Sequence, residues 1–572
     1  VISLNSTRNL SANEIKLQQR SAVISELKAT AIQSQQNVLT YLKKQERLGK
    51  AKDIEPFFIV NGIGVTATEE IAKKIATFPE VEEILPNEMI TLDVLEDEQI
   101  EAKPATNGEI EWNVDRVNAP EVWEMGIDGT GTVVAIMDTG VDWHHPALKH
   151  KYRGYNPETG EVDHTYSWYD RAEYSSEPTD GHSHGTHVAG TIVGSEENGT
   201  NKIGVAPGAK WIGVKVFRAD GTGTGIGYIS AAEWLLAPGG RADLAPDVVN
   251  NSWSSGFGFN EWFREIVQRW VHANIFPVYS AGNINERNPG GPYSISNPAN
   301  YPESFAVGAT DEYNLLAYFS LRGPSPYGEI KPDISAPGVF IRSSLPGGDY
   351  GYKSGTSMAA PAVAGVVALL KQIDKSIEVE DLANVLKQTA IPLTNTEYPD
   401  SPNNGYGHGL VDAHAALNII STEAGIVSGK VVSEITNLPL QANVSVLESD
   451  VTISTDSNSG LYSFIHRAGD YTLRAEAYGY QGLEKRVSID PKEEIEVNFA
   501  LQVKDKYTLA GTVINEDTKK PIEGATILLI EDSNIEPVSA NANGQFELTA
   551  YEGEYTVKVF APGYYDNEIL VT

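Results

Sequence analysis

The sequence predicts an α/β protein built on a mostly parallel sheet, preceded by a small α+β unit and followed by two small β-sandwich modules. Residues 132–140 form an apolar, β-branched run that ends in Asp-Thr-Gly, which is typical of a strand buried on both faces. Residues 358–370 form a long apolar stretch that favours a buried helix. Short alternating strands separated by Gly, Asn and Asp recur in residues 426–502 and 507–572, which indicates two related sandwiches.

Length and composition limit the functions to consider. A chain of 572 residues is long enough for several domains. The net charge of −34 argues against nucleic-acid binding and favours a very soluble, exported protein. The sequence contains no cysteine, which excludes disulfides and thiol chemistry, and no run of about 18 apolar residues that would predict a membrane span. No signal peptide is recognisable; the chain begins with Val1, which is compatible with prior removal of a targeting segment.

A candidate nucleophile lies at residues 354–361, Ser-Gly-Thr-Ser-Met-Ala-Ala-Pro. We expect Ser357 at the start of a buried helix, with Pro361 in the first turn, where its missing N–H costs little. Free N–H groups and the helix dipole favour a negative charge there. Taken alone, the segment is equally compatible with a simple helix cap.

The strand at residues 132–138 delivers a carboxylate, Asp138, to its carboxyl end, where open α/β sheets gather their active sites. Two alternatives are a turn cap and an aspartic protease. The second needs two carboxylates that share a proton. The chain has no second Asp-Thr-Gly, so that alternative is disfavoured.

The histidine-rich segment 180–191 contains His182, His184 and His187. A zinc site is one interpretation, but the chain lacks a His-Glu-x-x-His motif. The small residues after His184 allow a helix to pack closely, with His184 at its start projecting toward the sheet edge. We expect His187, one turn further, to be a packed structural histidine.

Ser357, His184 and Asp138 supply a nucleophile, a general base and the group that orients the base. Their order along the chain is Asp, His, Ser, the order of subtilisin. Over residues 112–420 the sequence resembles the subtilisin-type serine proteases (subtilases). The resemblance implies a catalytic domain at residues 109–422 with a three-layer, doubly wound, subtilisin-like sheet.

The resemblance also assigns further site residues. Asn283 corresponds to the family's oxyanion-hole asparagine, with the backbone N–H of Ser357 as the second donor; taken alone, Asn283 would be a turn residue. Two backbone segments, within residues 220–223 and 252–254, correspond to strands that pair with an extended substrate. The uncharged pocket lining predicts tolerance for large apolar or uncharged side chains. The predicted substrate-binding residues are Gly221, Thr222, Gly223, Ser252, Trp253, Ser254, Ser280, Ala281, Gly282 and Ser296.

No cofactor is needed for the predicted chemistry, and metal ligands stay unassigned. Many subtilisins carry a calcium-binding aspartate where this chain has Ala147, after His145-Pro146. The companion loop 196–201 still offers oxygen ligands, which calcium prefers. The alternative is a solvated acidic turn, so a structural calcium stays open.

The region before the catalytic domain resembles the inhibitory propeptide of subtilases. Residues 1–50 are predicted to be mainly helical, and residues 51–108 to form a ferredoxin-like α+β propeptide and a linker. Its elements are a strand at 56–65, a helix at 69–78 and a strand at 81–92. We expect residues 95–101 to cross the active-site cleft and cleavage to fall near residue 108, within 105–111. An unrelated α+β module is the alternative.

The two repeats at 426–502 and 507–572 resemble carboxypeptidase-regulatory or collagen-binding-B modules. A spacer role is favoured over binding to a cell surface or a polymer, because no basic or aromatic patch stands out. Repeat one continues through a strand at 494–501 that has no counterpart before Thr572. We therefore expect an incomplete second module and a longer parent protein.

The sequence thus predicts the precursor of a secreted serine endopeptidase that cleaves extracellular proteins and removes its own propeptide autocatalytically. The expected partners are protein or peptide substrates and the propeptide itself, with neither nucleic acid nor a membrane span. The alternative is a non-catalytic cell-surface adhesin built on a protease scaffold. The complete set of candidate catalytic residues weighs against that alternative.

Overall fold

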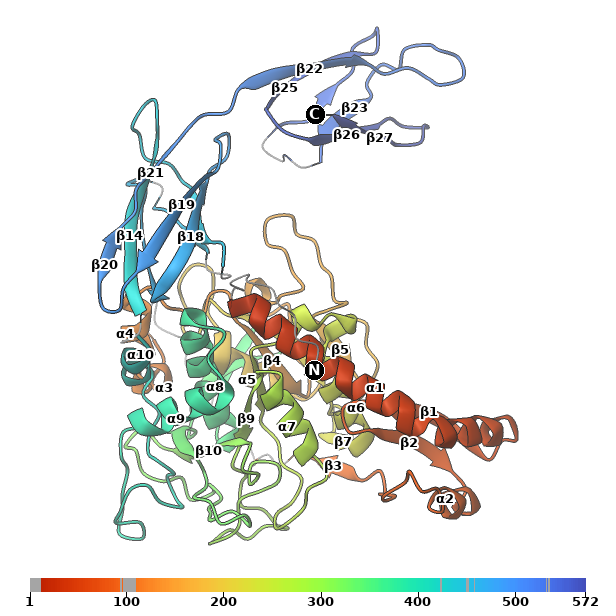
Figure 1. Ribbon diagram of the computed structural model, residues 1–572, viewed down its shortest axis with the longest axis vertical. Helices are drawn as coiled ribbons and strands as arrows, with labels where there is room; N and C mark the ends of the chain where they lie inside the picture. Colours follow the sequence, from red (N-terminus) through yellow and green to blue (C-terminus); the bar gives the residue numbers. More distant parts are fainter. Residues whose placement is uncertain are drawn as a thin grey trace.

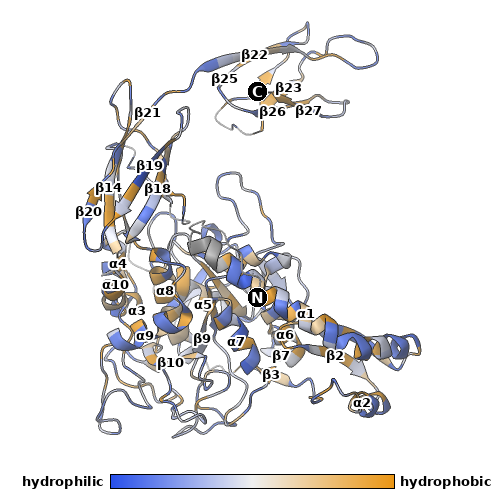
Figure 2. Cartoon of the chain, viewed as in Figure 1, coloured by the Kyte–Doolittle hydropathy of each residue, from blue (hydrophilic) through white to orange (hydrophobic). Residues whose placement is uncertain are grey.

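The computed structural model describes residues 12–92, 95, 110–421, 424–448, 452–456, 458–530, 532 and 535–571. An N-terminal α+β unit lies against a central α/β domain, and two β modules project away from that domain (Figure 1). Hydrophobic residues concentrate in the strands and helices of the central domain, whereas hydrophilic residues predominate at the projecting end of the N-terminal unit (Figure 2).

The central domain contains the predicted parallel sheet, in which every described strand pair is parallel. Its seven strands, in spatial order, are β11 (Ile334–Pro337), β10 (Phe305–Thr310), β9 (Phe276–Ser280), β8 (Val248–Asn251), β4 (Val133–Asp138), β6 (Lys210–Lys215) and β5 (Trp168–Asp170).

Both faces of this sheet are covered. Alternate residues of β4 point to opposite faces, so that Val134 and Ile136 join one core cluster while Ala135 and Met137 join the other. This arrangement confirms the predicted three-layer, doubly wound architecture. The helices on the two faces and around them are α3 (Trp112–Arg116), α4 (Ala119–Glu124), α5 (His184–Val193), α6 (Gly225–Leu236), α7 (Arg264–His272), α8 (Thr356–Ile373), α9 (Val379–Thr389) and α10 (Ala413–Ser421).

Helix α8 differs from the prediction in one respect. It begins at Thr356, which places Pro361 inside the helix rather than in its first turn. A proline there removes the bond that its N–H would give to the carbonyl four residues earlier, which is that of Ser357. The Ser252 hydroxyl donates to the Ser357 carbonyl instead, at 2.9 Å. The missing helical hydrogen bond is therefore replaced by one from the side chain that directly follows β8.

By its length and apolar composition alone, the same helix could cross a membrane, but 94% of it is buried inside the protein. It is the core helix of the central domain. No other helix in the described parts of the chain meets the two criteria.

The N-terminal unit contains α1 (Ala12–Arg47), β1 (Ala51–Phe57), β2 (Gly62–Ala67), α2 (Glu69–Ile75) and β3 (Met89–Thr91). The single strand expected at 56–65 is instead the end of β1, a turn at 58–61 and the start of β2, and Asn61 in that turn adopts a left-handed conformation (φ 45°). Of the strand expected at 81–92 only β3 forms, since Pro86 cannot donate a ladder hydrogen bond.

The described N-terminal residues do not form the multi-stranded sheet of a ferredoxin-like unit, because β1 pairs only with β2 and β3 pairs with a strand of the central domain. That strand is β7 (Thr222–Thr224). The central domain also carries a hairpin of β12 (Ile341–Leu345) and β13 (Asp349–Lys353), and the short 3-10 helices η1 (Lys149–Lys151), η2 (Pro238–Gly240) and η3 (Ala242–Leu244).

The C-terminal modules repeat one strand pattern over two packed sheets each. The strands of the first module are β14 (Ala424–Ser433), β15 (Asn443–Val446), β16 (Thr452–Ser454), β17 (Leu461–Arg467), β18 (Gly469–Glu476), β19 (Leu483–Ile489), β20 (Glu494–Glu496) and β21 (Phe499–Leu501). Those of the second are β22 (Lys506–Thr512), β23 (Thr526–Leu529), β24 (Val538–Ser539), β25 (Gln545–Tyr551), β26 (Tyr555–Phe560) and β27 (Asn567–Val571).

The pairings β14–β17 and β15–β18 recur as β22–β25 and β23–β26. In the first module β20 and β21 run parallel to β14, whereas in the described part of the second module β22 pairs only with β25.

Candidate active site

The predicted carboxylate and histidine meet at the carboxyl edge of the sheet. Asp138 is the last residue of β4 and His184 is the first residue of α5. His184 Nδ1 donates to Asp138 Oδ1 at 2.8 Å, and the two residues are 1% and 0% exposed. This bond places a proton on Nδ1 and leaves Nε2 as the basic nitrogen.

Glycine permits this close approach. A Cβ on Gly185 would lie 2.1 Å from the carbonyl oxygen of Gly140, and Gly140 itself has a left-handed φ of 99°. The helix that carries His184 therefore packs directly against the turn that follows Asp138.

Asp180 joins the same two segments. Its Oδ1 accepts from the Thr139 hydroxyl at 2.9 Å and from the His182 and Ser183 amides at 2.9 Å each. Its Oδ2 accepts from the Thr186 amide at 2.9 Å and the Thr186 hydroxyl at 2.7 Å. Asp180 thus satisfies N–H groups at the start of α5 and ties that start to the residue after Asp138.

Ser357 lies at the start of α8 as predicted and is 4% exposed. Its hydroxyl donates to the carbonyl of Ser252 at 3.1 Å. The Nε2 atom of His184 has no hydrogen-bond partner among the described residues. The structure therefore joins Asp138 to His184 but does not join His184 to Ser357. Such bonds are often long without substrate and tighten in the complex.

The two predicted oxyanion donors face a common space. Asn283 Oδ1 accepts from the Thr356 amide and the Thr356 hydroxyl, both at 3.0 Å, which fixes the orientation of the side-chain amide. A Cβ built on Gly355 would lie 3.6 Å from both Asn283 Nδ2 and the Ser357 backbone nitrogen. The absence of a side chain at Gly355 (φ 152°) keeps this space open.

The predicted substrate strand is occupied by the chain itself. β3 pairs antiparallel with β7, with Ile90 opposite Gly223 and Thr91 opposite Thr222. The Leu92 amide extends the ladder to the Gly221 carbonyl at 2.9 Å. The predicted crossing segment 95–101, apart from residue 95, and residues 105–109 around the predicted cut lie outside the described residues.

The other predicted pocket residues cluster, but they are buried rather than exposed. Gly282 and Ser296 touch so closely that a Cβ on Gly282 would lie 2.4 Å from the Ser296 hydroxyl. Trp253 points into an aromatic core, with its ring centroid 4.4 Å from that of Tyr228, and offers its backbone rather than its indole. The buried members of the set are Ser252, Trp253, Ser254, Ser280, Ala281, Gly282 and Ser296.

The histidines do not form a metal centre: the described residues contain no group of three or more His, Cys, Asp or Glu side chains suited to a metal ion. Nε2 of His187 faces the carbonyl oxygens of Ile341 and Gly351 at 3.0 and 3.2 Å. Burial lowers the pKa of His187 to about 3, with the nearby Lys353 and His184 acting in the same direction. His187 is a neutral, structural residue.

The loop at 196–201 does not fit calcium. The Glu196 carboxylate accepts from the Tyr350 hydroxyl and from Asn201 Nδ2, at 2.7 Å each. Asn201 Oδ1 accepts from the buried Arg342 guanidinium at 2.9 Å, and Arg342 also donates to Glu111 at 2.9 Å. The Arg342 guanidinium therefore already occupies the Asn201 side-chain oxygen that a calcium ion would need as a ligand.

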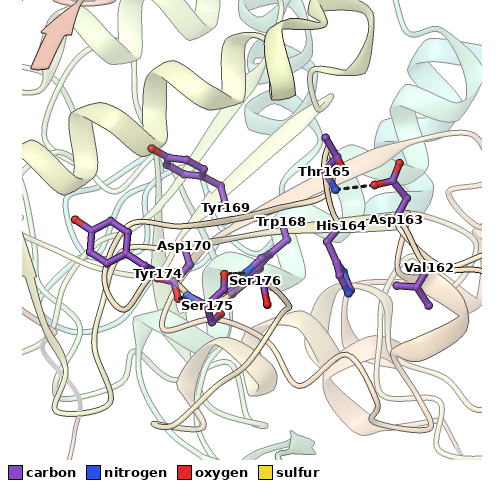
Figure 3. A pocket seen from close by; sticks show the side chains of 10 residues that line it. All are labelled: Val162, Asp163, His164, Thr165, Trp168, Tyr169, Asp170, Tyr174, Ser175 and Ser176. Carbon is purple, nitrogen blue, oxygen red and sulfur yellow. Dashed lines mark hydrogen bonds between the residues drawn. The ribbon is translucent and has the colours of Figure 1, made fainter.

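A cavity of about 480 Å³ lies apart from these residues, along segment 162–176 (Figure 3). The polar groups that line it mostly form hydrogen bonds within the same segment. Asp170, for example, accepts from the amides of Ala172, Glu173 and Ser175. This cavity does not contribute to the candidate active site.

Two residues near the site were not anticipated. Asp180 belongs to the histidine-rich segment 180–191, and an acidic residue shortly before a helix is itself a signal, because a carboxylate can accept from the free N–H groups at the helix start. Lys215 is fully buried opposite Asp138 in the β4–β6 register and donates to the Thr139 carbonyl at 2.7 Å. In the sequence, Lys215 could have been noticed as a charged residue at the end of a largely apolar strand.

Comparison with known proteins agrees with this geometry. Residues 129–409 match the model of the Subtilase family, and the C-terminal repeats match a CarboxypepD_reg-like domain (427–507) and a Carboxypeptidase regulatory-like domain (508–572). The chain therefore belongs to the subtilase family of serine proteases.

Among its relatives is Bacillopeptidase F of Bacillus subtilis (strain 168), with 34% identity over 99% of this chain; the match spans 62% of that protein. Subtilisin E of the same strain is 32% identical over 65% of this chain and 84% of its own length. M-protease of Shouchella clausii (strain KSM-K16) is 37% identical over 54% of this chain and 70% of its own length.

Replacing Asp180 tests its positioning role. Asp180→Ala removes five hydrogen bonds around the start of α5 and should destabilise the protein by about 2 kcal/mol or more. We expect kcat on a peptide substrate to fall more than KM rises, since His184 loses its support. Asp128→Ala is the matched control, because the hydrogen bonds of the Asp128 carboxylate stay within its own turn, at Thr130. Equal effects of the two changes would contradict the role.

The buried neutral His187 predicts acid sensitivity. Its pKa is about 3 when folded against about 6.5 when unfolded, so the unfolded chain binds the proton first as the pH falls. Stability from this group is complete above pH 6.5 and should decline by roughly 3 kcal/mol at pH 4. Urea unfolding of the Ser357→Ala chain at pH 7 and pH 4 measures this loss. His187→Gln should reduce the loss and the exposed His272→Gln should not; an unchanged loss in His187→Gln would contradict the assignment.

Proposed function

We propose that the chain is the precursor of a secreted serine endopeptidase, in which Ser357, His184 and Asp138 form the catalytic triad. The observation that carries this proposal is the buried 2.8 Å hydrogen bond between His184 and Asp138, beside a serine at a helix start. The bond orients the imidazole and leaves Nε2 able to accept a proton.

In the proposed reaction the Ser357 hydroxyl turns from the Ser252 carbonyl toward His184 Nε2. As the oxygen attacks the peptide carbonyl carbon, Nε2 takes its proton, and Asp138 stabilises the imidazolium that forms. The proton then passes to the leaving amine as the C–N bond breaks. Water hydrolyses the resulting ester by the same route in reverse.

The tetrahedral intermediate carries a negative oxygen. We assign its stabilisation to the Asn283 side-chain amide and the Ser357 backbone N–H, which converge on the space beside Gly355. Because Thr356 already holds Asn283 Oδ1, the amide needs no reorganisation when the charge develops.

In the precursor the N-terminal unit would act as an inhibitor. β3 uses the backbone of β7 that an extended substrate would need. Glu233 of α6 accepts from the Phe58 and Ile59 amides at 2.6 and 3.0 Å, which fastens the β1–β2 turn to the protease. We assign residues 1–108 to this inhibitory prosegment, with the cut near residue 108.

Substrate preference follows from the lining of the pocket. Ser252–Ser254, Ser280–Gly282 and Ser296 bring no charge, so large apolar or uncharged side chains should be accepted. The natural substrates would be extracellular proteins. We assign a spacer role to the two C-terminal modules, which project from the central domain (Figure 1).

Ser357→Ala tests the proposal. The unchanged chain should cleave itself near residue 108 and hydrolyse casein, and the variant should do neither, because the attacking oxygen is missing. Intact mass and N-terminal mass measurements locate the cut. Ser376→Ala is the matched control, since the Ser376 hydroxyl bonds only to Asp374 in its own turn.

Equal behaviour of Ser357→Ala and the unchanged chain would contradict the protease assignment. A chain that neither cuts itself nor casein, in spite of a correct fold, would favour a non-catalytic adhesin on this scaffold.

A further inference from the structure

Helix α1 has two partners along its length. Its buried positions 20, 24, 31, 35, 38, 42 and 45 form one stripe at helical spacing. The C-terminal part of the stripe, with Val38 and Leu42, packs against β1 and α2 of the N-terminal unit. The N-terminal part leaves that unit and contacts η3 and α7 of the central domain.

The contact with the central domain centres on Arg20, which is 4% exposed. Its Nε donates to the Ala273 carbonyl at 3.0 Å, Nη1 to the Ala245 carbonyl at 3.1 Å and Nη2 to the Pro246 carbonyl at 2.7 Å. We call these three carbonyls the Arg20 cradle. Ile24, one turn further along α1, joins the core cluster that contains Ala245 and Ala273.

The Arg20 cradle has the chemistry of a guanidinium site. Ala273 and Ala245 directly follow α7 and η3, where helix carbonyls lack partners within the helix and the helix dipole is negative. Asp247 adds a nearby negative charge, which opposes the lowering of the Arg20 pKa by burial. The planar fork of arginine reaches three divergent carbonyls, whereas the single ammonium of lysine does not have that geometry.

The Arg20 cradle lies at the edge of the sheet opposite the active site. Pro246 precedes β8 and Ala273 precedes β9, so both are at the amino ends of these strands. Ser252 and Ser280 lie at the carboxyl ends of the same two strands, beside Ser357. The N-terminal unit therefore contacts the central domain at the carboxyl edge of the sheet through β3, and near the amino edge through Arg20.

We propose that the Arg20 cradle is a distal docking site for the prosegment, which binds the guanidinium of α1 independently of the strand in the active-site cleft. This inference rests on the proposed function only for its consequence, namely that one cut near residue 108 leaves the prosegment bound. Two linked contacts raise the overall affinity because, when one is released, the contact still in place keeps the released segment at high local concentration near its site.

The docking itself is tested in the Ser357→Ala chain, where no cut is needed. Hydrogen exchange of amides 17–28 should accelerate by about 10- to 100-fold in Arg20→Ala, while amides 51–67 of the hairpin stay protected. Arg20→Lys should give an intermediate acceleration, and it provides the same readout should Arg20→Ala fail to fold. Arg47→Ala is the matched control, because Arg47 lies on the same helix and is exposed.

Equal exchange of amides 17–28 in Arg20→Ala, Arg20→Lys and Arg47→Ala would overturn the docking site. In the active chain, the cleaved prosegment should leave at least about 10-fold faster in Arg20→Lys, seen as a shorter lag before casein hydrolysis. An unchanged lag would overturn the consequence for release. Failure of the proposed protease function would appear separately, as absence of any cut while the exchange result stands.

Discussion

The hydrogen bond between Asp138 and His184 requires that the end of a central strand and the start of a helix touch without intervening atoms. Most features around the site follow from this requirement. Gly140 and Gly185 remove the side chains that would separate the two segments. Asp180 ties them together from outside. Lys215, from the neighbouring strand, donates a hydrogen bond to the Thr139 carbonyl and forms an ion pair with Glu173 at 3.1 Å. The parallel sheet supplies the common edge at which these groups meet.

The serine side of the site depends on a proline. Pro361 leaves the Ser357 carbonyl without its helical partner, and Ser252 replaces that partner while its own carbonyl accepts from the Ser357 hydroxyl. The two residues thus form a reciprocal pair that fixes the start of α8 against the end of β8. This pair also satisfies the carbonyl that the internal proline leaves without a helical donor. The Ser357 hydroxyl is thus bonded to a carbonyl and the His184 imidazole to Asp138, and the two side chains are not joined to each other.

Much of the central domain and its site could be predicted because the relevant patterns are local. Buried strands read as apolar, β-branched runs: Asp138 ends one such strand and Asn283 follows another, while His184 begins a helix of small and apolar residues. The parts that were not predictable depend on contacts between residues far apart in the chain. Nothing near residue 20 indicates that its guanidinium meets carbonyls about residues 245 and 273. The pairing of β3 with β7 and the insertion of Arg342 beside Asn201 are of the same kind. The hairpin at 51–67 was misread because its turn is apolar at Phe58 and Ile59, whose side chains pack against a core cluster of the central domain.

The function proposed for this chain depends on a serine nucleophile that is reactive in the freed protease and covered by β3 in the uncut chain. Labelling with a fluorophosphonate, which reacts with an activated serine, tests it most directly. In a time course followed by intact mass, the uncut chain should stay unlabelled, whereas the protease freed of its prosegment should gain one label at Ser357. Labelling of the uncut chain at the same rate as the freed protease would contradict the claim that β3 covers the site. Absence of label on either species would contradict the nucleophile itself.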